Sequence, residues 1–119
     1  MMGLDDLKFP FIVLWTGMKW EYHVEKIQDL SLQYYSAGHI EDKLKIIDNM
    51  LPLMSKALAL GRQYMNLFDS HPDQEFSHPD IRKHSYSSRD ERSCFDEFLR
   101  HLELDYRHYE CMSNMVLIR

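Results

Sequence analysis

The sequence contains few cysteines, which can form disulfides, and few glycines and prolines, which interrupt regular secondary structure. Two cysteines, four glycines and four prolines occur among the 119 residues, while 45% are hydrophobic and 28% are charged. Cys94 and Cys111 fall in one expected helix, about 25 Å apart along its axis, whereas a disulfide spans at most about 7 Å between Cα atoms. The composition predicts one globular domain over 1–119 without an internal disulfide, in a reducing, cytoplasmic location.

A long apolar run is also missing. The run from Phe9 to Trp15 covers seven residues, includes Pro10 and follows the acidic pair Asp5 and Asp6. A membrane-spanning helix needs about 20 apolar residues, and a secretory leader begins with basic residues. We therefore expect a soluble chain that uses no membrane.

Basic charge is not in excess, because 19 acidic residues face 14 basic ones, a net charge of −5. Nucleic acids and anionic membranes select net basic faces, so direct binding to either is not expected. Such a charge suits a protein partner with a basic surface. No glycine-rich phosphate loop, ordered catalytic triad or paired-cysteine motif occurs, so we expect no enzyme activity, no cofactor and no metal.

What the sequence does contain is helical periodicity. Apolar residues recur every three or four positions over 40–68, at Ile40, Leu44, Ile47, Leu51, Met54, Leu58, Gly61, Met65 and Phe68. A similar pattern over about 89–117 predicts another long helix. Pro52 predicts a kink or a split in the first of these, and the unbroken phase favours the kink. The fold class is therefore all-α, a bundle of three long amphipathic helices.

Residues 9–24 support two interpretations. Before Thr16-Gly17 the residues Phe9, Phe11, Val13 and Trp15 occupy alternate positions, and after it apolar residues alternate with Lys19, Glu21 and His23. This pattern is typical of a β-hairpin over 10–24. From Met18 onward a helical period also fits, and it continues until Ala37-Gly38, where a glycine cap would end a helix over about 18–37. We favour the helix and keep the hairpin as the alternative.

A polar segment over about 69–88 separates the last two helices. It has no apolar period and repeats Ser-His-Pro-Asp at 70–73 and 77–80, before a capping box from Ser88 to Glu91. Loops of this length are mostly functional or disordered. We predict that it contacts the partner, with Phe76 and Tyr86 as anchors and with the polar residues His71, Asp73, Glu75, His78 and Asp80.

Two further interpretations concern the same residues. The tripeptide His71-Pro72-Asp73 resembles the one that J-domain co-chaperones carry after a helix, which implies an adaptor that stimulates a heat-shock chaperone. Members of that family carry a strongly basic helix just before the tripeptide, whereas residues 52–69 of this chain offer only Lys56 and Arg62 as basic side chains. The other alternative is a metal-binding bundle that uses loop histidines (His71, His78, His84) or the last helix (Cys94, His101, His108), although neither spacing fits a compact site.

The aromatic content completes the functional prediction. Tyr22, Tyr35, Tyr64 and Tyr86 fall off the apolar stripes, and tyrosines are common interface anchors. We predict a small acidic helical protein-binding module that occupies a partner's surface. Immunity-type proteins and phage anti-defence proteins that inhibit a basic, nucleic-acid-handling target work in this way. The wide stripes over 40–68 and 95–116 also predict a homodimer.

Overall fold

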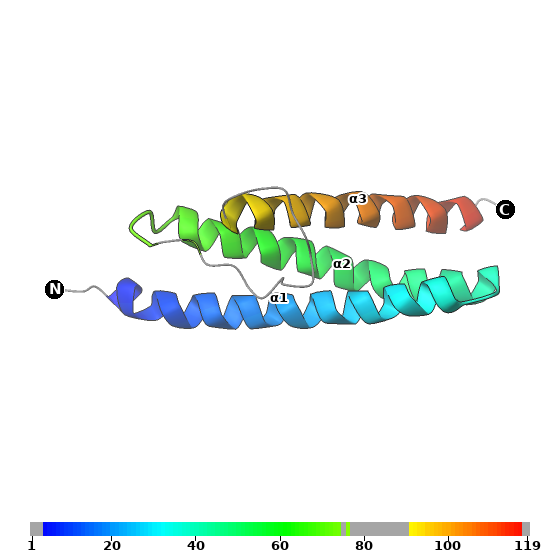
Figure 1. Ribbon diagram of the computed structural model, residues 1–119, viewed down its shortest axis with the longest axis horizontal. Coiled ribbons are helices and arrows are strands. Elements are labelled where there is room, and N and C mark those ends of the chain that lie inside the picture. Colours follow the sequence, from blue (N-terminus) through cyan, green and yellow to red (C-terminus); the bar gives the residue numbers. More distant parts are fainter. Residues whose placement is uncertain (1–3, 75, 77–90, 118–119) are drawn as a thin grey trace.

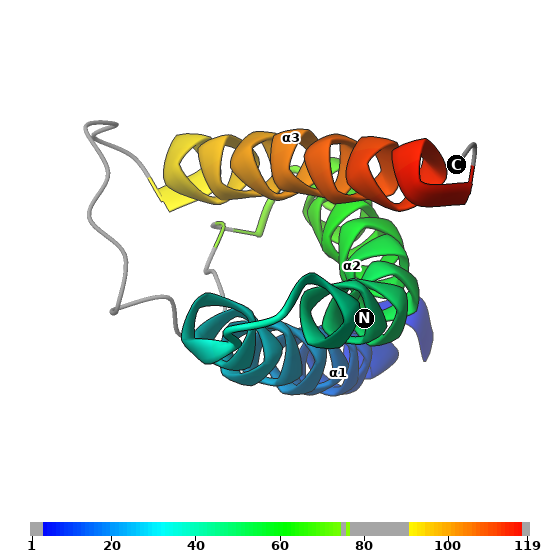
Figure 2. The same cartoon turned by 90° about the vertical axis from the view of Figure 1, so that its right-hand side faces the viewer.

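Three long helices make up the computed structural model, which describes residues 4–74, 76 and 91–117. Helix α1 spans Leu4–Ser36, α2 spans Ile40–Asp69 and α3 spans Glu91–Leu117 (Figure 1). Helix α2 runs antiparallel to both neighbours and packs against each of them, giving an elongated body of 62 × 29 × 21 Å (Figures 1 and 2). The predicted all-α fold is confirmed, and the described residues contain no strand.

The alternative hairpin over 10–24 is wrong, and the predicted helix start near residue 18 is too late. Helix α1 begins at Leu4 and continues through Pro10 and Gly17 without a turn. The first half of α1 carries apolar side chains on two opposite faces, with Phe9 and Trp20 on the buried one. Apolar residues on both sides of a helix can mimic the alternation of a strand.

The predicted glycine cap at Gly38 is also wrong. No described glycine has a positive φ angle, so Gly38 does not adopt the left-handed conformation of such a cap. The end of α1 is closed instead by the Ala37 N–H, which donates to the Gln33 carbonyl at 2.9 Å. The Ser36 hydroxyl adds a bond to the Leu32 carbonyl at 2.9 Å.

Helix α2 has the predicted bounds but neither the kink nor the split predicted at Pro52. It is one helix from Ile40 to Asp69 with Pro52 inside it. The ring of Pro52 lies on the exposed side, where water can bond the Asp48 carbonyl that loses its helical donor. Packing on both sides of α2 supports the surrounding turns.

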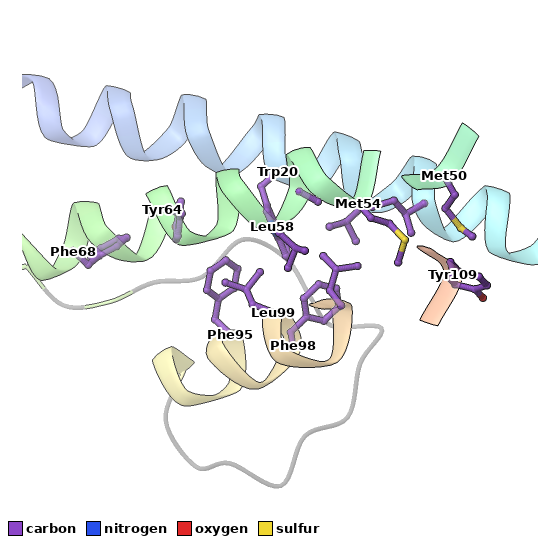
Figure 3. Packing of buried hydrophobic residues seen from close by; sticks show 14 of the residues in the cluster. Trp20, Met50, Met54, Leu58, Tyr64, Phe68, Phe95, Phe98, Leu99 and Tyr109 are labelled. Carbon is purple, nitrogen blue, oxygen red and sulfur yellow. The ribbon is translucent and has the colours of Figure 1, made fainter. Parts of the chain in front are cut away.

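The core lies along α2, which is buried on two faces because it is the central helix. Ile47, Met54, Leu58, Gly61 and Phe68 of the predicted stripe are buried, but Leu51 and Met65 are only half-buried and Ile40 is exposed. Met50, Ala57 and Tyr64 complete the core, so the prediction that Tyr64 lies off the apolar face is wrong. The stripe over 40–68 is therefore covered within one chain (Figure 3).

Candidate functional site

Only part of the predicted 69–88 site falls within the described residues. His71, Asp73 and Phe76 are described, and Asp73 is exposed. The candidates Glu75, His78, Asp80 and Tyr86 lie outside the described residues, as do His84 and the capping residue Ser88. The predicted partner contact at those positions stays a prediction.

Phe76 is packed into the end of the bundle. Its ring centroid lies 4.8 Å from that of Phe68, 5.9 Å from that of Tyr64 and 5.9 Å from that of Phe95. These rings come from α2 and α3, so Phe76 joins the chain after α2 to the core. Phe76 is half-buried, so as a partner anchor it could offer only part of its ring.

His71 is likewise engaged within the chain. Its Nδ1–H donates to the Leu67 carbonyl at 2.8 Å, and its ring lies 4.3 Å from the ring of Phe9. The hydrogen bond satisfies one of the carbonyls that the end of α2 leaves without a helical donor. His71 therefore fastens the end of α2 to the start of α1.

No arrangement of side chains in the described part of the chain supports the metal-binding alternative. There, no three His, Cys, Asp or Glu side chains gather closely enough to hold one ion. His101 Nε2 lies 4.0 Å from a Glu97 oxygen, and the His108 ring packs against that of Tyr109.

A shallow polar groove lies between α2 and α3. It has a volume of about 300 Å³, and its charged lining residues are Arg62, Asp69, Asp96, Arg100 and Glu103. Each of them belongs to an ion pair, including Arg62–Glu103 at 3.0 Å and Arg100–Asp96 at 3.0 Å. Partly exposed pairs of this kind contribute up to about 1 kcal/mol each. The groove is best explained as the polar margin of the α2–α3 contact.

The strongest candidate site is on the other side of the molecule, on α1. Large apolar side chains are exposed there, with 75% of Phe11 and 63% of Trp15 accessible. We call this surface the outer stripe, and its members are Phe11, Ile12, Leu14, Trp15, Met18 and Tyr22. The first five line one shallow apolar depression.

Helical geometry explains why the outer stripe cannot reach the core. At about 100° per residue, Phe11, Met18 and Tyr22 project on the side of α1 opposite Phe9, Trp20 and Ile27. The second set is buried against the other helices. One helix cannot turn both faces toward α2, so the outer stripe stays in water.

Charged side chains border the outer stripe. The Lys19 ammonium lies 4.6 Å from the centre of the Trp15 ring, and the Lys26 ammonium lies 5.6 Å from that of Tyr22. The Nδ1–H of His23 donates to the Lys19 carbonyl at 2.7 Å. Residues 8–26 contain three lysines and two glutamates, a net charge of +1 within a chain of net charge −5.

Reading α1 as a single helix would have revealed the outer stripe from the sequence. The tyrosine pattern indicates one member of this face, because Tyr22 is exposed on it, whereas Tyr35 lies about 140° around α1 from Tyr22 and hydrogen-bonds Tyr109 of α3. The larger part was hidden by the choice between a hairpin and a helix that begins at residue 18. Either choice removes Phe11, Leu14 and Trp15 from the helix that aligns them with Met18.

No helix in the described part of the chain is long and apolar enough to cross a membrane. Comparison with models of known protein families, with curated proteins and with solved structures found no match to this chain.

Proposed function

We propose that this chain is a small helical protein-binding module that acts by occupying the surface of a partner. The observation that carries the proposal is the outer stripe of α1. Exposed apolar surface costs about 25 cal/mol per Å² relative to burial, and large aromatic side chains dominate the energy of most interfaces. A partner surface that covers Phe11, Leu14 and Trp15 would recover that free energy.

The chemistry of the outer stripe supports binding. Apart from the indole of Trp15 and the phenol of Tyr22, its side chains offer only carbon and sulfur to a partner. Trp and Tyr combine a large apolar surface with one polar atom, which suits the core of an interface. The proposed role is therefore association.

The charge of the whole chain supports a partner with a basic surface. A net charge of −5 speeds the approach to such a surface and discourages acidic partners. Asp73 is exposed near the end of α2, where it can meet a basic group. Our proposal includes the class of inhibitors predicted from the sequence, immunity-type or phage anti-defence proteins acting on a nucleic-acid-handling target in the cytoplasm.

Site-specific photocrosslinking in the source organism tests this proposal. A photoreactive amino acid replaces Met18 in the outer stripe or, as the control, Leu32, which is exposed on α1 beyond the stripe. We expect position 18, and not position 32, to capture a protein partner. Leu14→Lys should then weaken binding to that protein by at least about 30-fold without changing helicity. Unchanged binding by Leu14→Lys would contradict the proposal.

A further inference from the structure

The size of the outer stripe requires an explanation. Its six side chains are between 41% and 75% exposed, and because side chains of this size present about 150–250 Å² each, together they expose on the order of 700 Å². The largest apolar patch on a typical monomer covers about 300–600 Å² and is often functional. A patch of this size calls for a covering surface.

We infer that a second copy of this chain covers the outer stripe, with the α1 helices of the two copies packed antiparallel. The inference rests on the proposed function, because it takes the outer stripe as a docking surface and names its occupant. Full coverage of two outer stripes would bury up to about 1,400 Å², and stable protein interfaces bury about 1,200–2,000 Å². One copy therefore supplies enough apolar area to cover another.

Local charge permits this contact despite the acidity of the chain. Two bodies of net charge −5 repel each other at long range, but the Debye length at physiological salt is about 8 Å. At that distance a partner helix meets residues 8–26, whose net charge is +1. The outer stripe is thus on a stretch where two copies approach with little repulsion.

The order of residues along the outer stripe favours an antiparallel arrangement. Its midpoint lies between residues 16 and 17, so a two-fold axis there would set Phe11 of one copy against Tyr22 of the other. Trp15 would meet Met18, and aromatic–aromatic and sulfur–aromatic contacts both stabilise interfaces. The Lys8 end of one stripe would meet the Glu25 end of the other, whereas a parallel pair would place like charges together.

Mass measurement in solution provides the first test. At about 100 μM, where an interface of micromolar affinity is populated, we expect the mass of two chains for the wild type. Leu14→Lys should behave as one chain, with at least a 30-fold rise in the dissociation constant. Leu32→Lys is the matched control, because Leu14 and Leu32 are exposed by 62% and 69% on the same helix. Leu32→Lys should remain a dimer, and circular dichroism should show that both variants keep their helicity.

The orientation of the two copies can be measured with spin labels. Asp29 is exposed on α1, and Asp29→Cys can carry a label in a Cys94→Ala, Cys111→Ala background of wild-type mass and helicity. An antiparallel pair centred between residues 16 and 17 places the two labels about 40 Å apart at 1.5 Å per residue. A parallel pair would place them about 10 Å apart.

Three results would overturn the inference. They are a wild type of single-chain mass at about 100 μM, a Leu14→Lys protein that stays dimeric, and a label distance near 10 Å. A single-chain wild type that binds anionic vesicles through the outer stripe would show that a membrane surface takes the place of the second copy. If the wild type has single-chain mass while position 18 crosslinks to another protein, the second copy is excluded and the proposed function stands.

Discussion

Gly61 is the residue at which all three helices meet. A Cβ atom at this position would overlap Leu99 Cδ2 of α3 and lie 3.1 Å from Trp20 Nε1 of α1. Trp20 is fully buried, and its Nε1 has no hydrogen-bond partner within the described residues. The missing side chain of Gly61 therefore gives the indole of Trp20 and the Leu99 side chain the space in which they pack.

Gly61→Ala should destabilise the fold although alanine is the better helix former. The gain in helix propensity is at most about 1 kcal/mol, whereas an added methyl group in a filled core costs about 1–3 kcal/mol. Trp20 and Leu99 are both buried, so shifting either side chain disturbs contacts in the core. We expect a net loss of about 1 kcal/mol in urea unfolding. Gly38→Ala is the control, because nothing lies within 4 Å of its Cβ position; a loss as large at Gly38 would contradict the explanation.

Tyr109 should make the fold sensitive to alkaline pH. Burial raises the pKa of its phenol above the ordinary value of 10.0, and a hydrogen bond with Tyr35 raises it further. Above pH 10 the unfolded chain loses a proton that the folded chain keeps, so stability falls as pH rises. Well below pH 10 the phenol is protonated in both states, so its ionisation does not make the free energy of unfolding depend on pH.

Thermal unfolding of the wild type and Tyr109→Phe at pH values from about 8 to 11 measures this effect, since that interval brackets the ordinary tyrosine pKa. The variant cannot ionise at this position, so its melting temperature should fall less steeply than that of the wild type as the pH rises. The variant also loses the Tyr35 hydrogen bond, which lowers its stability at every pH. Parallel curves for the two proteins would show that Tyr109 does not couple ionisation to unfolding.

At the scale of the elements, α2 shows what the spacing of apolar residues predicts about a helix and what it does not. The spacing of apolar residues located this helix to within one residue of Ile40–Asp69. It did not identify the most buried side, because α2 is covered by α1 on one side and by α3 on the other. Met50 was left out and is fully buried, whereas Leu51 was included and is half-buried.

Aspartate substitutions at these two neighbours should therefore differ in cost. Met50→Asp places an unpaired charge in the core and should unfold the protein, with a loss of more than about 4 kcal/mol. In Leu51→Asp the carboxylate can reach water, so we expect a loss of about 1–3 kcal/mol and retained helicity. Circular dichroism and urea unfolding measure both. A larger loss of stability for Leu51→Asp than for Met50→Asp would mean that α2 is rotated toward the phase expected from the sequence.

The first half of α1 and the burial of Phe76 after α2 are the features that local sequence patterns do not predict. The apolar residues in the first half of α1 serve two surfaces, and local alternation cannot distinguish that case from a strand. Phe76 gave no local signal, because its burial depends on Tyr64 and Phe95, which are distant in sequence or on another helix. Fold class and two of the helices follow from local pattern. The outer stripe follows once α1 is taken as one helix, whereas the burial of Phe76 follows only from how the helices are assembled.

At the scale of the whole molecule, α3 is attached differently from the other two helices. Its backbone packs on α2 and not on α1 (Figure 2). It reaches α1 through long side chains, with Phe95 against Trp20 at 4.9 Å between ring centroids and Tyr109 against Tyr34 at 5.4 Å. At its start, Arg92 donates to both carboxylate oxygens of Asp69, an exposed pair of modest strength.

This attachment predicts that α3 opens before the α1–α2 pair. Helices α1 and α2 are joined by the three residues 37–39 and share the longer contact, so they should remain folded when α3 separates. Native-state hydrogen exchange in low urea should then give a lower opening free energy for amides at Leu99 and Leu102 than for those at Met54 and Ala57. Trp20→Ala should lower the opening free energy of α3 by about 2–4 kcal/mol, because the indole is the largest link between α1 and α3. The opening free energy of α2 should fall by at least as much, because α2 opens only when these contacts are already broken. Amides of α2 and α3 could instead exchange with one common opening free energy in both the wild type and Trp20→Ala. The three helices would then open as a single unit, and the side-chain links between α3 and α1 would be as strong as direct helix packing.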